Sequence, residues 1–264
     1  MRTMRSTTVG SAGPPLRLVE RNARAWSGMW LTFVSVLLEP VLFLFSIGVG
    51  VGALVGDVDL GGGRMVPYRE FVAAGLLAVS AMFGPVFDTT YNFFVKLKYF
   101  KVYDAVLATP MRTRDVLNGE VLWSQLRGAV YATAFLVTMV VLGLVQSWWA
   151  LLAVPVASLV GYAFASGGLM GSTFMRSWTD FDWVNVALLP MFLLSATFFP
   201  LSRYPEWLQH VVQLTPLYQG VALERGLVLG ELSWTMLLNV AYLVVMGTVC
   251  RLVAGRRMER MLKP

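Results

Sequence analysis

The stretch LLEPVLFLFSIGVGVGALV, residues 37–55, decides the fold class of this chain. It is long enough to cross a bilayer as a helix, which takes about 20 apolar residues, and its one charged side chain is Glu39. The 264 residues are 57% hydrophobic and only 14% charged, whereas soluble domains carry about 25% charged residues. The sequence therefore predicts an all-α integral membrane protein.

Further apolar runs of membrane length follow along the chain, and together they predict six transmembrane helices. Gln146 and Ser147 alone separate the third and fourth runs, which predicts a tight hairpin, and Trp148 and Trp149 at this turn are typical interfacial residues. The expected spans are residues 30–55, 71–95, 122–145, 148–174, 183–200 and 233–253.

The distribution of basic residues predicts that both termini lie in the cytoplasm. With an even number of spans the termini share one side, and only four of the 21 lysines and arginines fall on the other: Arg64, Arg69, Arg203 and Arg225. Lipid headgroups are the natural counterions for this charge, so nucleic acid is not an expected partner. Residues 1–28 contain no apolar core typical of a signal peptide, so the first span is expected to be retained.

The residue types needed for most catalytic and metal sites are scarce. One cysteine, Cys250, excludes an internal disulfide and a cysteine-based metal cluster, and one histidine, His210, excludes a multi-histidine site. The chain contains no G-x-x-x-x-G-K-[ST] phosphate loop, nucleophile elbow or zinc motif. We therefore expect no enzyme, no metal and no cofactor in this chain.

The expected organisation is one membrane domain with short cytoplasmic ends. A tail and an amphipathic interfacial helix occupy residues 1–28, the six-helix domain residues 29–253, and a basic tail residues 254–264. Within the membrane domain, two connecting segments carry the functional hypotheses, an inner one at 96–118 and an outer one at 201–232.

The inner segment has the pattern of a short amphipathic helix at the membrane surface. Apolar and aromatic residues recur at helical spacing from Tyr99, and Thr109-Pro110 ends the helix because the residue before proline avoids the α region. A second helix begins at Thr113 or Arg114. Either this is an interfacial connector or it is a docking helix that transmits force from a cytoplasmic partner. The candidate coupling residues are Tyr99, Lys101, Tyr103, Asp104, Leu107, Thr109 and Pro110.

The outer segment predicts a short helix that is too amphipathic for a loop and too short to span. Pro200 is expected to end the fifth span, Pro205 to open the new helix and Pro216 to stop it. Trp207 belongs to its apolar face, and His210 to its polar face, as a solvated residue or as a ligand or proton relay. Such a helix lies in the outer interface or re-enters the membrane under a protein cover.

Two carboxylates inside spans are functional candidates because a lone charge in lipid costs at least about 2.5 kcal/mol. We expect Glu39 to face the bundle or a transport path, paired with Arg127, or to be a structural hydrogen-bond partner. Asp88 lines a vestibule or caps a kink. The candidate residues of a translocation path are Glu39, Phe87, Asp88 and Phe198.

Three stretches carry a family resemblance: EPVLFLFSIGVGVG (39–52), LATPMRTRDVLNGE (107–120) and FFPLSRYPEWLQHVVQLTPLYQGVALERG (198–226). They resemble the type-2 ATP-binding-cassette exporter permeases, and within them the NodJ-like group, which exports lipo-oligosaccharides, and the daunorubicin-resistance permeases. The resemblance covers nearly the whole chain after about residue 17.

The resemblance implies a six-span permease that pairs with a second permease chain, identical or different, in the plasma membrane of a bacterium. A separate ATPase subunit, which uses ATP and Mg, would dock on the inner segment, and short re-entrant helices would follow the fifth span. The cargo would be amphipathic or lipid-linked and would leave along spans one, two and five. The alternatives from other classes are a proton-coupled secondary transporter using Glu39 and Asp88, and a membrane-embedded transferase.

Overall fold

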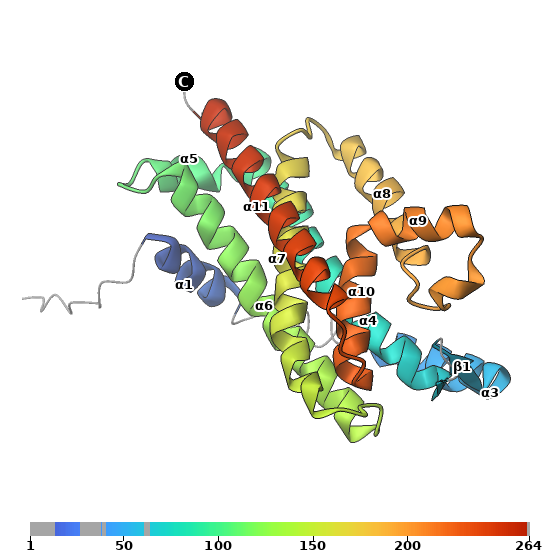
Figure 1. The fold of residues 1–264 in the computed structure, drawn as a ribbon. Coiled ribbons are helices and arrows are strands. Elements are labelled where there is room, and N and C mark those ends of the chain that lie inside the picture. Colours follow the sequence, from blue (N-terminus) through green and yellow to red (C-terminus); the bar gives the residue numbers. More distant parts are fainter. Residues whose placement is uncertain (1–13, 27–37, 39–40, 61–63, 263–264) are drawn as a thin grey trace, which may run out of the picture.

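The computed structural model describes residues 14–26, 38, 41–60 and 64–262, which are mostly helical (Figure 1). Its helices are α1 (Pro14–Trp26), α3 (Gly52–Val55), α4 (Tyr68–Phe87), α5 (Val102–Leu107), α6 (Thr113–Val141), α7 (Ala153–Ser172), α8 (Phe181–Leu193), α9 (Glu206–Leu214), α10 (Pro216–Leu229) and α11 (Thr235–Leu262). Shorter turns are the π-helical η1 (Ser46–Val51), η2 (Asp88–Asn92) and η3 (Val95–Tyr99) and the 3₁₀ turns η4 (Trp148–Leu152), η5 (Trp178–Asp180) and η6 (Leu201–Arg203). The strands are β1 (Asp57–Asp59) and β2 (Met65–Pro67).

Among the described residues, four helices are long and apolar enough to cross a membrane. They are Tyr68–Tyr99, which joins α4 to η2 and η3, Thr113–Val141, Trp148–Ser172 and Thr235–Met261. These correspond to the second, third, fourth and sixth expected spans. Of the first, residues 41–45 are α-helical and continue into η1 and α3, while 30–37, 39 and 40 lie outside the described residues.

The fifth expected span, 183–200, is wrong in its extent. Helix α8 has 13 residues and ends at Leu193, so it is about 20 Å long against a hydrocarbon core of about 30 Å. Beyond it, the Ser195 hydroxyl donates to the carbonyl of Phe192 (2.9 Å), and Ala196 adopts a left-handed conformation at φ 57°. Side-chain hydrogen bonds and a left-handed residue therefore end this helix well before Pro200.

Helix α4 lies at the centre of the bundle, with α6, α7 and α10 packed around it and α11 outside against α7 (Figure 1). Glycines permit these close approaches. A Cβ at Gly168 would lie 2.3 Å from Thr89 Oγ1, and one at Gly220 would lie 2.8 Å from a methyl of Val160. Both glycines thus lie where a side chain would prevent the helices from approaching so closely.

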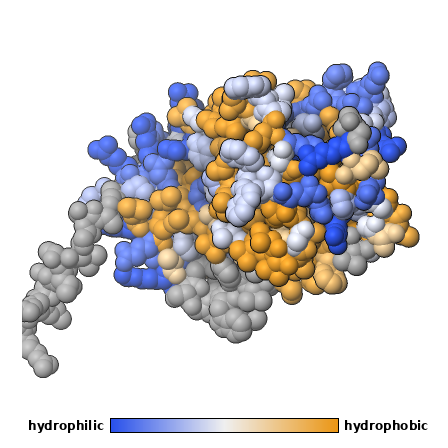
Figure 2. All heavy atoms as spheres, turned by 60° about the horizontal axis from the view of Figure 1, so that its bottom comes forward, coloured by the Kyte–Doolittle hydropathy of each residue, from blue (hydrophilic) through white to orange (hydrophobic). Residues whose placement is uncertain are grey.

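The outer surface of the bundle is apolar. Figure 2 shows hydrophobic residues over much of one face, with hydrophilic residues gathered at its sides. Leu238 on α11 is 71% exposed and Val141 on α6 is 78% exposed. A contiguous apolar surface of this kind is unfavourable in water and favourable in lipid.

Helix α1, α5 and the end of α11 lie at one end of the bundle. Leu18 of α1 packs over Gly119 at the start of α6, and Arg114 Nε lies 2.8 Å from Glu259 Oε1 near the end of α11. Helix α1 and the end of α11 thus lie at the same end of the bundle, and the side of the membrane that this end faces stays a prediction.

The opposite end holds the α6–α7 hairpin and the two strands. Strands β1 and β2 form an antiparallel pair in which Val58 faces Val66. Arg64 beside it donates to Gln146 Oε1 (3.1 Å) and to the Leu229 carbonyl (2.8 Å), and it pairs with Glu231 Oε1 at 3.3 Å. Arg64 thus joins the hairpin turn, the end of α10 and the loop after it.

Candidate functional site

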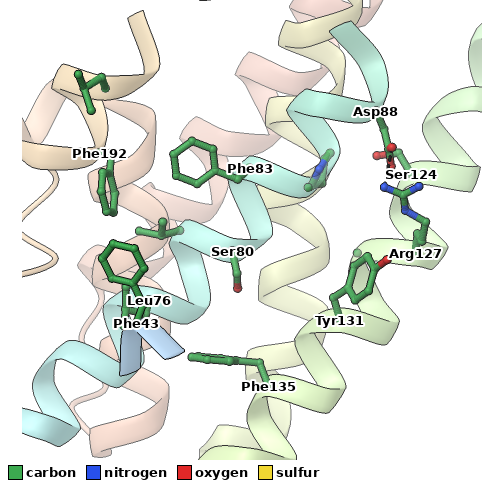
Figure 3. A pocket seen from close by; sticks show the side chains of 15 residues that line it. Phe43, Leu76, Ser80, Phe83, Asp88, Ser124, Arg127, Tyr131, Phe135 and Phe192 are labelled. Atoms are coloured by element: carbon green, nitrogen blue, oxygen red, sulfur yellow. Dashed lines mark ion pairs between the residues drawn. The ribbon is translucent and has the colours of Figure 1, made fainter. Parts of the chain in front are cut away.

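A cavity of about 230 Å³ lies between α4, α6 and α8 at membrane depth (Figure 3). One part of its wall is polar and comes mainly from α4 and α6, and the other is aromatic and comes from α4, α8 and residue 43. Its described lining residues are Phe43, Leu76, Val79, Ser80, Phe83, Gly84, Pro85, Asp88, Ser124, Arg127, Gly128, Tyr131, Phe135, Leu189 and Phe192.

The polar part contains a buried ion pair between α6 and the end of α4. Arg127 Nη2 lies 2.6 Å from Asp88 Oδ1, and the two side chains are 10% and 8% exposed. Asn92 Nδ2 donates to the same carboxylate oxygen at 2.9 Å. A buried pair of this kind persists only when its geometry is good and further hydrogen bonds satisfy it.

The local sequence explains why the carboxylate is placed here. Pro85 lies within α4 and has no N–H, so the helical ladder is interrupted and continues as the π-helical η2, which begins at Asp88. The hydroxyls of Thr89 and Thr90 donate to the carbonyls of Pro85 (2.7 Å) and Val86 (2.6 Å). The wider turn directs Asp88 toward α6, and the threonine hydroxyls add hydrogen bonds to carbonyls within the same turn.

The aromatic part is a set of edge-to-face rings. Phe192 of α8 lies 5.7 Å from Phe83 of α4 and 6.4 Å from Phe43, between ring centroids. Phe198 packs on the far side of Phe192 at 5.3 Å. Such pairs favour these geometries and hold the rings in place beyond simple burial.

Of the candidate path residues, the structure brings Asp88 and Phe198 to this region and separates Phe87 from it. Phe87 is 56% exposed and lies on another face of the helix, toward Tyr91 and α8. Glu39 lies outside the described residues, so its pairing with Arg127 stays a prediction. The structure pairs Arg127 with Asp88.

A second polar cluster, centred on Glu120, fixes the inner segment. Glu120 is buried on α6, with its Oε2 2.8 Å from Lys96 Nζ and its Oε1 3.7 Å from Arg21 Nη2 of α1. The Tyr103 hydroxyl of α5 donates to Oε1 at 3.0 Å. One carboxylate therefore links α1, η3, α5 and α6.

Tyr103 is fully buried, with its ring 5.2 Å from that of Phe93. Burial, and after it the neighbouring Glu120 carboxylate, raise the pKa of Tyr103 well above its ordinary value of 10.0, so the hydroxyl stays a donor. Because its side chain faces the interior, Tyr103 positions α5 and does not present itself to a partner.

The other coupling candidates lie mostly on the surface. Helix α5 has six residues, shorter than the sequence suggested, and begins after Lys101, which is left-handed at φ 46°. The following helix starts at Thr113, as predicted. Tyr99, Lys101, Asp104, Thr109 and Pro110 are exposed, whereas the Leu107 side chain lies outside the described part.

The outer segment forms two helices that return into the bundle. Pro205 precedes α9, and Pro216 opens α10 with Thr215 Oγ1 accepting from the Tyr218 amide (3.4 Å). The end of α9 reaches α11, where the Tyr242 hydroxyl donates to the Leu214 carbonyl at 2.8 Å. From there α10 runs buried beside α4 to Gly230, next to the α6–α7 turn at Ser147.

The burial of α9 differs from its expected apolar face. Trp207 is 69% exposed and Leu214 is also exposed, whereas Val212 is fully buried. His210 is exposed, as expected for a residue on a solvated polar face. The exposed tryptophan at the start of α9 is typical of contact with a lipid interface.

Residues 16–229 match the sequence profile of the family described as ABC-2 type transporter. The chain belongs to the ABC-2 type transporter family. It is also similar to Nodulation protein J of Rhizobium leguminosarum bv. viciae, 31% identical over 250 residues that cover 94% of each chain. Nodulation protein J of Rhizobium meliloti (strain 1021) is 30% identical over 247 residues, 92% of each chain. That of Azorhizobium caulinodans is 28% identical over 246 residues, 91% of this chain and 95% of the relative.

Family membership fixes the general role of the chain. It is a multi-pass membrane protein and a permease of the ABC-2 type, and permeases of this family normally work with a separate ATP-binding subunit. The resemblance on which the sequence was assigned to this family is therefore confirmed.

Several residues of the site were not identified from the sequence. Ser124 and Tyr131 line the cavity from α6, and Glu120 holds the inner cluster. Their spacing in the sequence could have identified them as a group. Residues 120, 124, 127 and 131 are three or four apart and so share one face of a helix. Glu224 of α10 was also missed, and its carboxylate is fully buried with no hydrogen-bond partner among the described residues.

Proposed function

We propose that this chain is the permease subunit of an exporter that moves an amphipathic or lipid-linked molecule out of the cytoplasm, driven by a separate ATPase. The proposed substrate classes are lipo-oligosaccharides and hydrophobic drugs. The observation that carries the proposal is the family match over residues 16–229, joined to a sequence with no phosphate-binding loop of its own.

The inner segment supplies the coupling surface. Lys101, just before α5, and Asp104 within it are exposed, while Tyr103 attaches the same helix to Glu120. A displacement of α5 is therefore transmitted to α6 and α1 through the buried Glu120 carboxylate, because this carboxylate contacts all three helices. Mechanical coupling of this kind needs rigid contacts between the docking element and the spans.

The cargo proposal has two supports. The first is similarity to Nodulation protein J of several rhizobia, over more than nine-tenths of the chain in the most extended matches. The second is the cavity, whose wall combines aromatic rings with an ion pair, as an amphipathic molecule requires. A second permease chain, identical or different, completes the proposed assembly. Asp88 is ion-paired with Arg127, so the structure does not favour the alternative in which it carries protons.

The test is transport by the chain together with its partner ATPase subunit, reconstituted in lipid vesicles. A fluorescent lipo-oligosaccharide should move only when both subunits and ATP are present. The charge reversal Asp104→Arg should lower the permease-stimulated ATPase rate and the transport about tenfold, because it alters the docking surface. The matched reversal Asp57→Arg, on β1 at the opposite end, should change neither.

Uphill transport by the chain alone, without the ATPase, would overturn the proposal. So would identical effects of the two reversals, since these would separate α5 from any special role.

A further inference from the structure

We propose that the groove between α7 and α8 holds one resident membrane phospholipid with a zwitterionic headgroup. The phosphate of the lipid would lie against Arg176, its ammonium group against Asp180, and one acyl chain along the glycines of α7. The lipid stays in place and is not transported, so this inference goes beyond the proposed function and does not depend on it.

The first argument is the groove itself, which encloses about 670 Å³. Among the described elements, α8 packs most extensively on η5, the turn before it, and stands off from α7. Figure 1 shows α7 and α8 joined at the end of the bundle where α11 finishes. The space between them is lined largely by apolar residues, among them Val86 of α4, Phe164, Gly167 and Gly171 of α7, and Val184 and Leu188 of α8.

The second argument is the length of the groove. Along α7 the lining runs from Phe164 to Gly171 and then across the turn to Arg176, which is on the order of 10–15 Å at the rise of a helix. One leaflet contributes about half of a hydrocarbon core that is about 30 Å thick. The groove therefore matches one acyl chain of a single leaflet.

The third argument is the composition of the groove at its mouth. Trp183 of α8 lines it and is 74% exposed, and exposed tryptophans gather at the level of the lipid headgroups. Gly171 lines it from α7, and a Cβ there would meet nothing within 4 Å. The wall beside the expected headgroup level is thus open enough to admit a chain that enters from the lipid.

The fourth argument is the pair of opposite charges at this end of the groove. The Arg176 amide donates to Asp180 Oδ2 at 2.6 Å, and the Arg176 side chain is exposed and can reach a further partner. Arginine binds phosphate through two parallel N–H donors. The amides of Arg176 and Ser177 hold the pKa of Asp180 below its ordinary value of 3.8, so this carboxylate is charged and suits the three donors of an ammonium group.

Arg257 of α11 fixes the polar end of the groove. Its guanidinium carbon lies 3.6 Å from the centroid of the Phe174 ring, and its Nε donates to Thr173 Oγ1 at 3.2 Å. Phe174 lines the groove next to Arg176. A cation over a ring face is attractive, so these contacts tie the headgroup end of the groove to the last turns of α11.

The experiment uses the full chain in lipid nanodiscs and a phospholipid probe with a diazirine in one acyl chain. The first probe has a phosphoethanolamine headgroup, and a matched probe with the same chains has a phosphoglycerol headgroup, which lacks the ammonium group. Mass spectrometry of the labelled peptides locates the contact. We expect saturable labelling within residues 164–171 and 184–188, about threefold stronger for the zwitterionic probe.

A first variant fills the groove. Gly171→Leu places a side chain in the open space without a clash at its first atom, and it should weaken labelling about tenfold because the acyl chain loses contact area. Gly50 also has nothing within 4 Å of a Cβ and does not line the groove. Gly50→Leu is therefore the matched control and should label normally.

A second variant removes the positive charge at the headgroup. Arg176→Gln should weaken labelling by both probes about threefold, as expected for an exposed ion pair. Arg203 of η6 is also exposed but does not line the groove, so Arg203→Gln should have no effect. Arg176→Gln carries the test if Gly171→Leu does not fold.

Three results would overturn the inference. The first is labelling that neither groove variant changes, or that is strongest with the phosphoglycerol probe. The second is absent labelling together with a disulfide-linked dimer of Trp183→Cys in a Cys250→Ala background, because a second copy of the chain would then occupy the groove. The third is loss of labelling during ATP turnover with the partner ATPase, since the lipid would then be cargo. The proposed function is measured separately, by ATP-driven transport.

Discussion

The ion pair of Asp88 and Arg127 shows how this chain carries charge inside lipid. Both residues belong to spans, both are nearly buried, and Asn92 adds a further bond to the carboxylate. Because the opposite charges lie close together, neither side chain has to change its protonation state or extend to water. The pair thereby fixes the register of α6 against α4.

Removing one partner should be far more damaging than removing both. We expect Asp88→Asn or Arg127→Met alone to lower the free energy of unfolding by about 3–5 kcal/mol, because each removes the close partner of a buried charge. The double variant should recover much of this loss. The coupling energy between Asp88 and Arg127 can be measured by thermal unfolding in detergent of the wild type, the two single variants and the double variant. Additive losses of stability would show that the two residues are not coupled.

The sequence identified Asp88 as an unusual intramembrane acid but did not identify its partner. Arg127 was instead expected to pair with Glu39, the other carboxylate within a span. Which carboxylate meets the arginine depends on the rotation of two helices about their axes. Here the π-helical turn after Pro85 sets that rotation, and hydropathy does not reveal such a turn.

At the scale of elements, the segment after α8 shows where hydropathy misleads. The residues LSATFFP at 194–200 are apolar enough to continue a span, yet they form a non-helical turn in which residues 195–197 are buried and Phe199 is exposed. Ser195 and Thr197 exchange a hydrogen bond of 2.7 Å, and the Ala196 carbonyl accepts from Arg225 Nη2 at 2.8 Å. Turns inside the protein and helices that span the membrane can both be apolar. Composition alone therefore does not distinguish a turn from a helix in this segment.

The left-handed Ala196 gives a prediction for this turn. A left-handed residue with a Cβ costs about 1–2 kcal/mol, so Ala196→Gly should leave stability unchanged or raise it by up to about 1 kcal/mol after the entropy of glycine is counted. Ala196→Val should lower stability by about 2 kcal/mol or more, because a branched side chain fits this conformation poorly. Midpoints of thermal unfolding rank the three proteins, and a glycine variant less stable than valine would refute the account.

The inner segment illustrates a different limit. The Thr109-Pro110 pair correctly predicted a break, and the next helix begins at Thr113, one of the two starts expected, but Tyr103 was grouped with Tyr99 as a residue that couples to a partner. Tyr103 is buried because Glu120, 17 residues later, accepts its hydroxyl. A contact across that distance in the chain is outside what local periodicity shows.

Tyr103→Phe should therefore loosen α5. Loss of a hydrogen bond to a carboxylate should cost about 1.5–3 kcal/mol near neutral pH. Because the folded pKa of Tyr103 is raised, its contribution is complete below pH 10.0, where the unfolded tyrosine is neutral, and is lost as the pH rises above that value. The difference in unfolding free energy between wild type and Tyr103→Phe should shrink above about pH 10. A difference independent of pH would contradict this assignment.

For the whole molecule, the arrangement of charge predicts its orientation in the membrane. The end that holds α1, α5 and the last turns of α11 carries most of the basic residues, and the hairpin end carries few. Interior-facing loops of membrane proteins are enriched in lysine and arginine. The end with α5 should face the cytoplasm.

Single cysteines test this orientation in a Cys250→Ala background. Thr109 near α5 and Ser202 in η6 are both exposed, so either position can react. In intact cells an impermeant maleimide should label Ser202→Cys and not Thr109→Cys, and inverted vesicles should give the opposite pattern. The same pattern in both preparations would refute the topology.

Arg64 restricts how the outer end of the molecule can open. Its guanidinium bonds to Gln146, Leu229 and Glu231, which belong to the hairpin turn, to α10 and to the loop that follows. These three segments cannot separate one at a time, because moving any of them alone strains the bonds to the others. We therefore expect the hairpin turn, the end of α10 and the following loop to move as one unit in any rearrangement of this end.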